Sequence, residues 1–247
     1  MRCVLCLVWL LWAAPVHAGA FLQREGMLLT IHDVAVSQSR GAYGAQASPY
    51  KKMEGDTSME LGVISWFTLL TRVQSMQLLT STDAQWRAGP RMAELGGRLR
   101  LWQSRDYILS TQLVLRQPDV ISPQPGALYA RDWRIMLGRS FDIYGWPAFW
   151  SLAPGLRQRG GGARDEIHLE ITAGSFIADR WQVIGQGFSL WRQGNGLEPG
   201  GYQHKLQGSL IFNAGRAWSL EAGYFFTLAG HQMREEVGWK LALWRRM

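Results

Sequence analysis

Charged residues recur at every second position within several apolar stretches of the chain, and their spacing suits them to line a pore. The candidate selectivity residues are Arg72, Arg98, Arg100, Arg134, Lys205, Glu60, Glu94, Asp132, Glu170 and Glu221, and Arg116, Lys240, Glu166 and Glu236 share the same polar faces. In a wide pore, rows of opposite charge select solutes by charge. In a narrow one the same side chains pair and close the lumen. The sequence leaves both arrangements open.

Other residues that could carry chemistry form no recognisable motif. The histidines His32, His168, His204 and His231 occur singly, without metal-type spacing. No serine lies in a G-x-S-x-G turn. The run Gly160–Gly162 is followed by neither Lys-Ser/Thr nor a helical pattern, so it predicts a hairpin loop. We expect no metal and no cofactor, and a non-enzymatic protein is favoured over a barrel enzyme that modifies lipids.

The first 18 residues predict a secretory signal peptide. Arg2 is followed by the apolar run Val4–Ala14, and Pro15–Ala18 offers small residues for cleavage after Ala18. The apolar run is shorter than the ~20 residues that a spanning helix needs. Both cysteines, Cys3 and Cys6, lie in this segment, so residues 19–247 have no disulfide framework. We expect these residues to form one domain.

Alternation with a period of two indicates β-strands in that domain. In Trp218–Leu228 every second residue is apolar or aromatic, and Glu94–Trp102 places Arg98 and Arg100 on one face with leucines on the other. A helical period would put those two arginines on different faces. We predict strands at 27–37, 57–66, 68–79, 92–103, 106–116, 130–141, 147–158, 165–175, 180–192, 202–214, 217–228 and 235–245.

The predicted connections are alternately short and long, which is typical of an outer-membrane β-barrel. Tight turns face the periplasm in such proteins, and longer loops face the outside. Aromatic residues gather near strand ends, where they suit the two membrane interfaces. The sequence therefore predicts a closed, antiparallel, up-and-down transmembrane barrel of about 12 strands. A soluble β-sandwich or lipocalin-like barrel also alternates, but it has fewer strands and accepts fewer inward charges.

Several motifs also resemble a little-characterised group of proteobacterial outer-membrane β-barrels. They are Gly19-Ala20-Phe21-Leu22-Gln23, Met59-Glu60-Leu61-Gly62 before Trp66-Phe67-Thr68, Glu94–Trp102, Leu137–Phe141 and Gly160–Glu166. The resemblance implies a barrel in the outer membrane, and it brings no activity or catalytic residues.

Together these features predict a channel or transporter for small solutes. The net charge of +7 favours anionic ones. Arg98, Arg100 and Arg134 are the residues we expect to set selectivity. The alternative is a plugged barrel that has a structural, assembly or partner-binding role through its outer loops. Expected partners are outer-membrane lipid and a small solute, and not nucleic acid.

Overall fold

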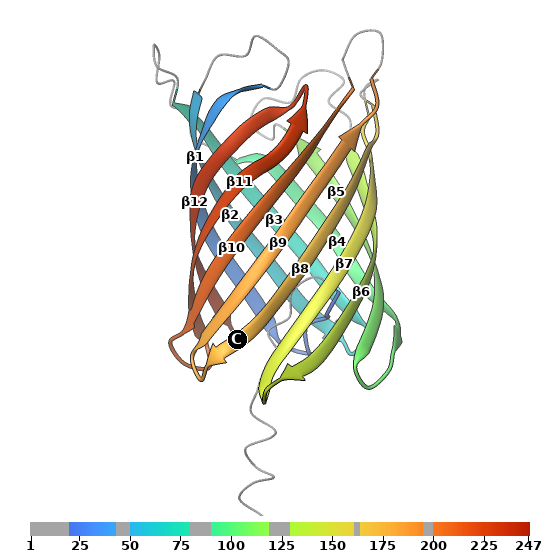
Figure 1. The fold of residues 1–247 in the computed structure, drawn as a ribbon. Helices are drawn as coiled ribbons and strands as arrows, with labels where there is room; N and C mark the ends of the chain where they lie inside the picture. Colours follow the sequence, from blue (N-terminus) through green and yellow to red (C-terminus); the bar gives the residue numbers. More distant parts are fainter. Residues whose placement is uncertain (1–19, 43–49, 80–89, 119–128, 161–163, 195–199) are drawn as a thin grey trace, which may run out of the picture.

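The chain folds into a single closed antiparallel barrel of twelve strands, seen in the computed structural model (Figure 1). The structure describes residues 20–42, 50–79, 90–118, 129–160, 164–194 and 200–247, so the predicted signal peptide lies outside the described residues. The strands are β1 (Leu28–Ala42), β2 (Tyr50–Ile64), β3 (Phe67–Leu79), β4 (Pro90–Gln103), β5 (Tyr107–Pro118), β6 (Ala130–Ile143), β7 (Trp146–Gln158), β8 (Glu166–Ala178), β9 (Trp181–Arg192), β10 (Gly201–Asn213), β11 (Trp218–His231) and β12 (Arg234–Arg246). The predicted fold class is confirmed.

Pairing of the first and last strands closes the barrel. Strand β1 pairs with β12 over Leu29–Ala42, and at the end of this ladder Leu28 and Met247 exchange two backbone hydrogen bonds of 2.9 Å. The C-terminus therefore lies at the end of the barrel that carries the short turns (Figure 1). Among the described residues, no helix is long and apolar enough to cross a membrane.

Two connections are shorter than the sequence predicts. Strands β1 and β2 extend to Ala42 and from Tyr50, so most of the loop expected at 37–57 is strand, and only 43–49 lie outside the described residues. Strands β11 and β12 are joined by two residues instead of the longer connection expected at 228–235. In both places the strands continue into segments whose two faces are polar. Such segments have the composition of a loop, so the sequence does not reveal them as strand.

The outer face of the barrel is apolar over most of its height. Leu95, Leu113, Ile135, Ile171 and Leu241 point outward and are between 40% and 67% exposed. Trp66, Trp102, Trp181 and Trp218 lie close to the short turns, where amphipathic rings suit a membrane interface. An apolar band of this extent is what a barrel presents to hydrocarbon.

The interior differs from the prediction at the end with the short turns. The polar face was expected to point inward along every strand, but here many inward side chains are apolar and pack into two clusters, with buried polar side chains such as Thr68 and Ser110 beside them. One contains Leu29, Phe149, Ile184, Ile211, Ala242 and Trp244, and the other contains Ala20, Leu22, Ile108, Met136 and Ala153. Phe21 packs against both. An apolar layer therefore occupies much of the lumen at the short-turn end.

This layer should contribute strongly to stability. Ile211 is fully buried, so Ile211→Ala leaves a cavity and should lower the free energy of unfolding by about 2–5 kcal/mol. Leu228→Ala, on the outer face at 60% exposure, should cost less because detergent or lipid fills the space. Urea unfolding of the two variants in detergent measures the difference, and equal losses would contradict a packed interior.

Candidate functional site in the barrel lumen

Residues 20–23 enter the barrel from the short-turn end and lie inside it. Ala20, Leu22 and Gln23 are at most 8% exposed. The ring of Phe21 meets that of Phe149 edge to face, with centroids 6.3 Å apart. This segment, called the N-terminal plug below, completes the apolar layer.

Polar groups of the wall satisfy the backbone of the N-terminal plug. The Ser110 hydroxyl donates to the Ala20 carbonyl at 2.9 Å, and the backbone N–H of Gln23 donates to the Thr68 hydroxyl at 3.1 Å. The Gln23 side chain donates to Glu60 at 3.0 Å. A buried segment with no sheet partner needs such bonds, because an unpaired backbone group costs free energy in an apolar interior.

Arg98 is the charged residue that joins the wall to the N-terminal plug. Its Nη1 donates to the Phe21 carbonyl at 2.7 Å, and its Nη2 lies 3.3 Å from Glu60 Oε1. Nε and Nη2 also donate to Gln112 Oε1, at 3.2 and 3.1 Å. Arg98 is only 7% exposed. Arg98 therefore holds the N-terminal plug to the barrel wall. The sequence does not reveal this role.

Two wall glycines leave room for the chain that leads into the barrel. A Cβ atom at Gly62 would lie 2.0 Å from the Arg24 carbonyl oxygen, and one at Gly138 would lie 2.9 Å from the Ala20 Cβ. Any side chain at Gly62 would collide with backbone. The entering segment and the wall are thus fitted to each other.

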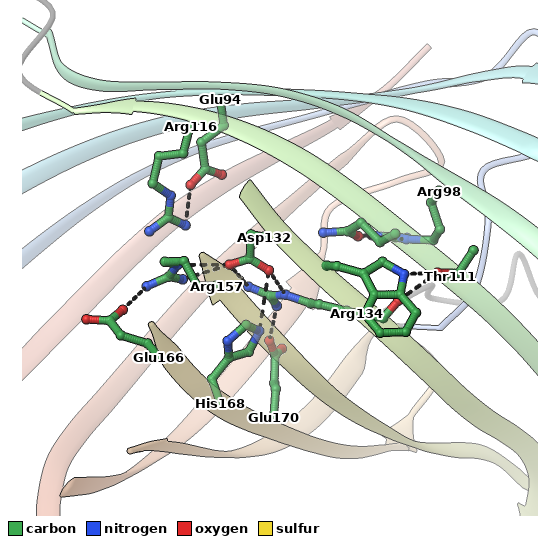
Figure 2. Close-up of polar contacts among 12 residues, drawn as sticks. Glu94, Arg98, Thr111, Arg116, Asp132, Arg134, Arg157, Glu166, His168 and Glu170 are labelled. Atoms are coloured by element: carbon green, nitrogen blue, oxygen red, sulfur yellow. Dashed lines mark hydrogen bonds and ion pairs between the residues drawn. The ribbon is translucent and has the colours of Figure 1, made fainter. Parts of the chain in front are cut away.

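Above the apolar layer, Asp132 is the centre of a network of ion pairs (Figure 2). The carboxylate is 1% exposed and accepts from Arg134 Nε at 2.9 Å and from Arg157 Nη2 at 2.8 Å. Arg134 continues to Glu170 at 3.0 Å, and Arg157 to Glu166 at 2.9 Å. Each charge therefore has a partner, as buried charges require.

His168 lies within the same network. Its Nε2 is 3.4 Å from Asp132 Oδ1, and its ring occupies the space above Gly155, where a Cβ would approach it to 2.2 Å. Glu166 also binds Arg192 at 2.7 Å and Arg159 at 3.3 Å. The upper wall from β6 to β9 thus carries a continuous chain of alternating charges.

The other lumen charges form smaller groups of the same kind. Arg72 pairs with Asp56, Arg116 pairs with Glu94, and Lys240 lies 3.6 Å from Glu221. Glu236 binds both Lys205 and Lys52. Glu221 also accepts from the Trp244 indole at 3.0 Å and from Ser209 at 2.7 Å, which ties the charged region to the apolar layer.

These ion pairs run along the wall of the barrel. Asp132 and Arg157 lie on the adjacent strands β6 and β7, whereas Arg134 and Glu170 are separated by one strand, β7. One intervening strand likewise separates Glu60 from Arg98, and another separates Lys205 from Glu236. Among the described residues, the pairs join ten basic side chains to nine carboxylates. These paired charges are therefore close to neutral in sum. Of the two arrangements that the sequence leaves open, they form ion pairs and not rows of one sign.

Nine of the ten candidate selectivity residues lie in this lining. Among the described residues, Arg100 joins none of these ion pairs. It lies at the short-turn end of β4, where its guanidinium donates to the exposed Gln103 side chain. Sequence reasoning missed Lys52, Asp56, Arg157 and Arg192, which complete the network. It also assigned no role to Ala20–Gln23. The alternation on β2 could have identified Lys52 and Asp56, had that strand been recognised at its full length.

Removal of the central carboxylate should destabilise the barrel. Asp132→Ala leaves Arg134 and Arg157 without their shared partner, and breaking a buried pair costs about 3–5 kcal/mol. Asp142→Ala, at an exposed position near the β6–β7 turn, should cost almost nothing. Denaturant unfolding of both variants measures the effect, and a wild-type midpoint for Asp132→Ala would show that the network is dispensable.

Comparison with known proteins places the fold among outer-membrane barrels. No protein-family model and no curated protein matches the chain. An outer membrane channel from Pseudomonas putida F1 is similar in structure, with a TM-score of 0.67 over 95% of this chain and 100% of its own, at 12% identity. The NanC porin (TM-score 0.58, 6% identity, 86% and 98% covered) and the beta domain of the Bordetella autotransporter BrkA (0.57, 12%, 90% and 100%) are also similar. At these identities the likeness shows the fold alone.

Proposed function

We propose that this protein is an outer-membrane channel for small solutes, with the N-terminal plug closing its periplasmic end in the conformation described. The observation that carries the proposal is the division of the lumen into two layers. Charges line the extracellular half along the wall, and an apolar layer with Ala20–Gln23 fills the periplasmic half. A barrel that is always closed would need only the apolar layer, and it would not need a charged lining.

The exterior and the known structures support this placement. The apolar outer band requires hydrocarbon around it, and the twelve-stranded fold with both tight turns and C-terminus at one end is the bacterial outer-membrane topology. The channel from Pseudomonas putida F1 and the NanC porin share this fold. The predicted signal peptide of residues 1–18 would supply the export signal.

The contacts of the N-terminal plug indicate how the channel would open. The plug is covalently attached to the barrel only through Arg24–Met27, and four side chains of the wall hold it: Ser110, Thr68, Arg98 and Glu60. Withdrawal of a short segment leaves the sheet ladder intact. Opening therefore requires no change in strand pairing.

Deletion of Ala20–Gln23 should raise single-channel conductance severalfold in planar bilayers. The plug packs among the wall side chains that fill this end of the lumen, so its loss opens space between them. A folded deletion variant that stays silent would contradict a channel.

Charge at the periplasmic exit should tune selectivity. Arg100 lies at the short-turn end of β4 with Gln103 as its hydrogen-bond partner, so Arg100→Glu changes the exit charge without breaking an ion pair of the lining. In the plug-deleted background, the reversal potential in a salt gradient should shift toward cations. Gln103→Ala is the control that removes only the hydrogen bond. An unchanged reversal potential would remove Arg100 from the conduction path.

One observation favours the alternative of a plugged structural barrel. The N-terminal plug is buried inside the barrel, with Ala20 fully buried and Leu22 7% exposed. If the deletion variant conducts while the full-length protein never opens, the barrel is held shut in its native state. A role that depends on its outer loops then becomes the better conclusion.

A further inference from the structure

A pocket of about 550 Å³ lies on the outside of the barrel near the extracellular rim, away from the lumen. It is lined in part by Asp165, Ile167, Trp191, Arg192, Tyr202 and His231, from β8 to β11 and the adjoining loops. Its volume lies within the roughly 300–1,000 Å³ typical of ligand sites. The mixture of aromatic and charged groups distinguishes it from the aliphatic outer face around β4 and β5.

The aromatic rings of this pocket form a connected surface. Tyr202 stacks with His231 at a centroid distance of 6.2 Å, and the rings of Trp191 and Tyr202 each lie 5.4 Å from His204. Flat rings of this kind pack against the apolar face of a sugar. Asp165 supplies a carboxylate that can accept hydrogen bonds from the hydroxyl groups of a saccharide.

A polar pair lies next to the pocket toward the membrane. Ser189 and His204 face each other across β9 and β10, with the Ser189 hydroxyl 2.8 Å from His204 Nδ1. Polar side chains that face hydrocarbon are costly and usually serve a function. Depending on the tautomer of His204, either its second ring nitrogen or the Ser189 hydroxyl can donate a hydrogen bond to the carbonyl of an acyl linkage.

Farther along the same strands three glycines lie on the outer face. Gly185 pairs with Gly208 across β9 and β10, and Gly187, two residues along, pairs with Leu206, whose side chain lies beside it. A Cβ at Gly185 or Gly208 would meet no atom within 4 Å, so packing inside the chain does not require glycine there. From Trp191 to Gly185 the strand covers about 20 Å, enough for much of an acyl chain.

From this order of features we infer that the outer face of β8–β11 binds an acylated saccharide lipid of the extracellular leaflet. The saccharide occupies the aromatic pocket, the acyl linkage lies at Ser189–His204, and the acyl chain lies over the glycines. A glycerophospholipid lacks the sugar faces that would use the stacked rings. The inference rests on the proposed location in the outer membrane and is independent of conduction.

Native mass spectrometry of the refolded protein, with lipid A as the probe and phosphatidylglycerol as the comparison, tests this site. Gly208→Leu adds a side chain into open space and should leave the fold intact, as heat-modifiable gel mobility verifies. It should weaken lipid A retention about tenfold, and Tyr202→Leu should do the same. Ala93→Leu, on the outer face of β4, is the matched control and should retain lipid A like the wild type.

The outcomes separate this site from the channel. Wild-type retention of lipid A by both Gly208→Leu and Tyr202→Leu would overturn the inference, as would equal retention of phosphatidylglycerol by the wild type. Conductance of the plug-deleted barrel should be unaffected by Gly208→Leu. A barrel that binds lipid A at this site but never conducts would refute only the proposed channel.

Discussion

The structure depends on closure of the sheet, because a spanning β-sheet must satisfy every backbone group between its own strands. The ladder between β1 and β12 removes the two free edges. Once the sheet is closed, each side chain points either to the lumen or to the outside, and the two-residue period assigns its side. A slip of one residue would place Arg98 on the outer face and Leu99 in the lumen, so the register is strongly determined.

Closure also creates an interior that must be filled or hydrated, and this barrel does both at different heights. Near the short turns, Ile211, Trp244 and Phe149 fill the space together with Phe21. Higher in the lumen, charges such as Asp132 and Arg157 are held to the wall by their neighbours. Because these pairs follow the wall, they need not cross the lumen. The obstruction at the short-turn end is therefore made by side chains of the wall together with a short segment that lies outside the sheet.

The sequence predicts the twelve strands, the outward apolar face and the location of the short turns together at one end of the barrel. These follow from local alternation, which is visible in stretches such as Trp218–Leu228. It cannot predict which charges pair, because Arg134 meets Glu170 across an intervening strand and only the register brings them together. The apolar layer was missed because β7 is apolar on both faces around Phe149 and Trp150. The burial of Ala20–Gln23 was missed because four residues are too few to show a periodic pattern. Their burial also depends on Ser110, Thr68 and Arg98, which lie far along the chain.

The position of residues 20–23 is best tested by the reactivity of a cysteine placed there. Outside Cys3 and Cys6 the chain has no cysteine, so Leu22→Cys introduces a single thiol in the barrel domain. Leu22 is 7% exposed, whereas Tyr144, in a short turn, is 100% exposed. A lumen closed by this segment predicts that a bulky, charged thiol reagent labels Leu22→Cys far more slowly than Tyr144→Cys in the folded protein. Equal labelling rates would show that the segment lies in solvent and that the periplasmic end is open.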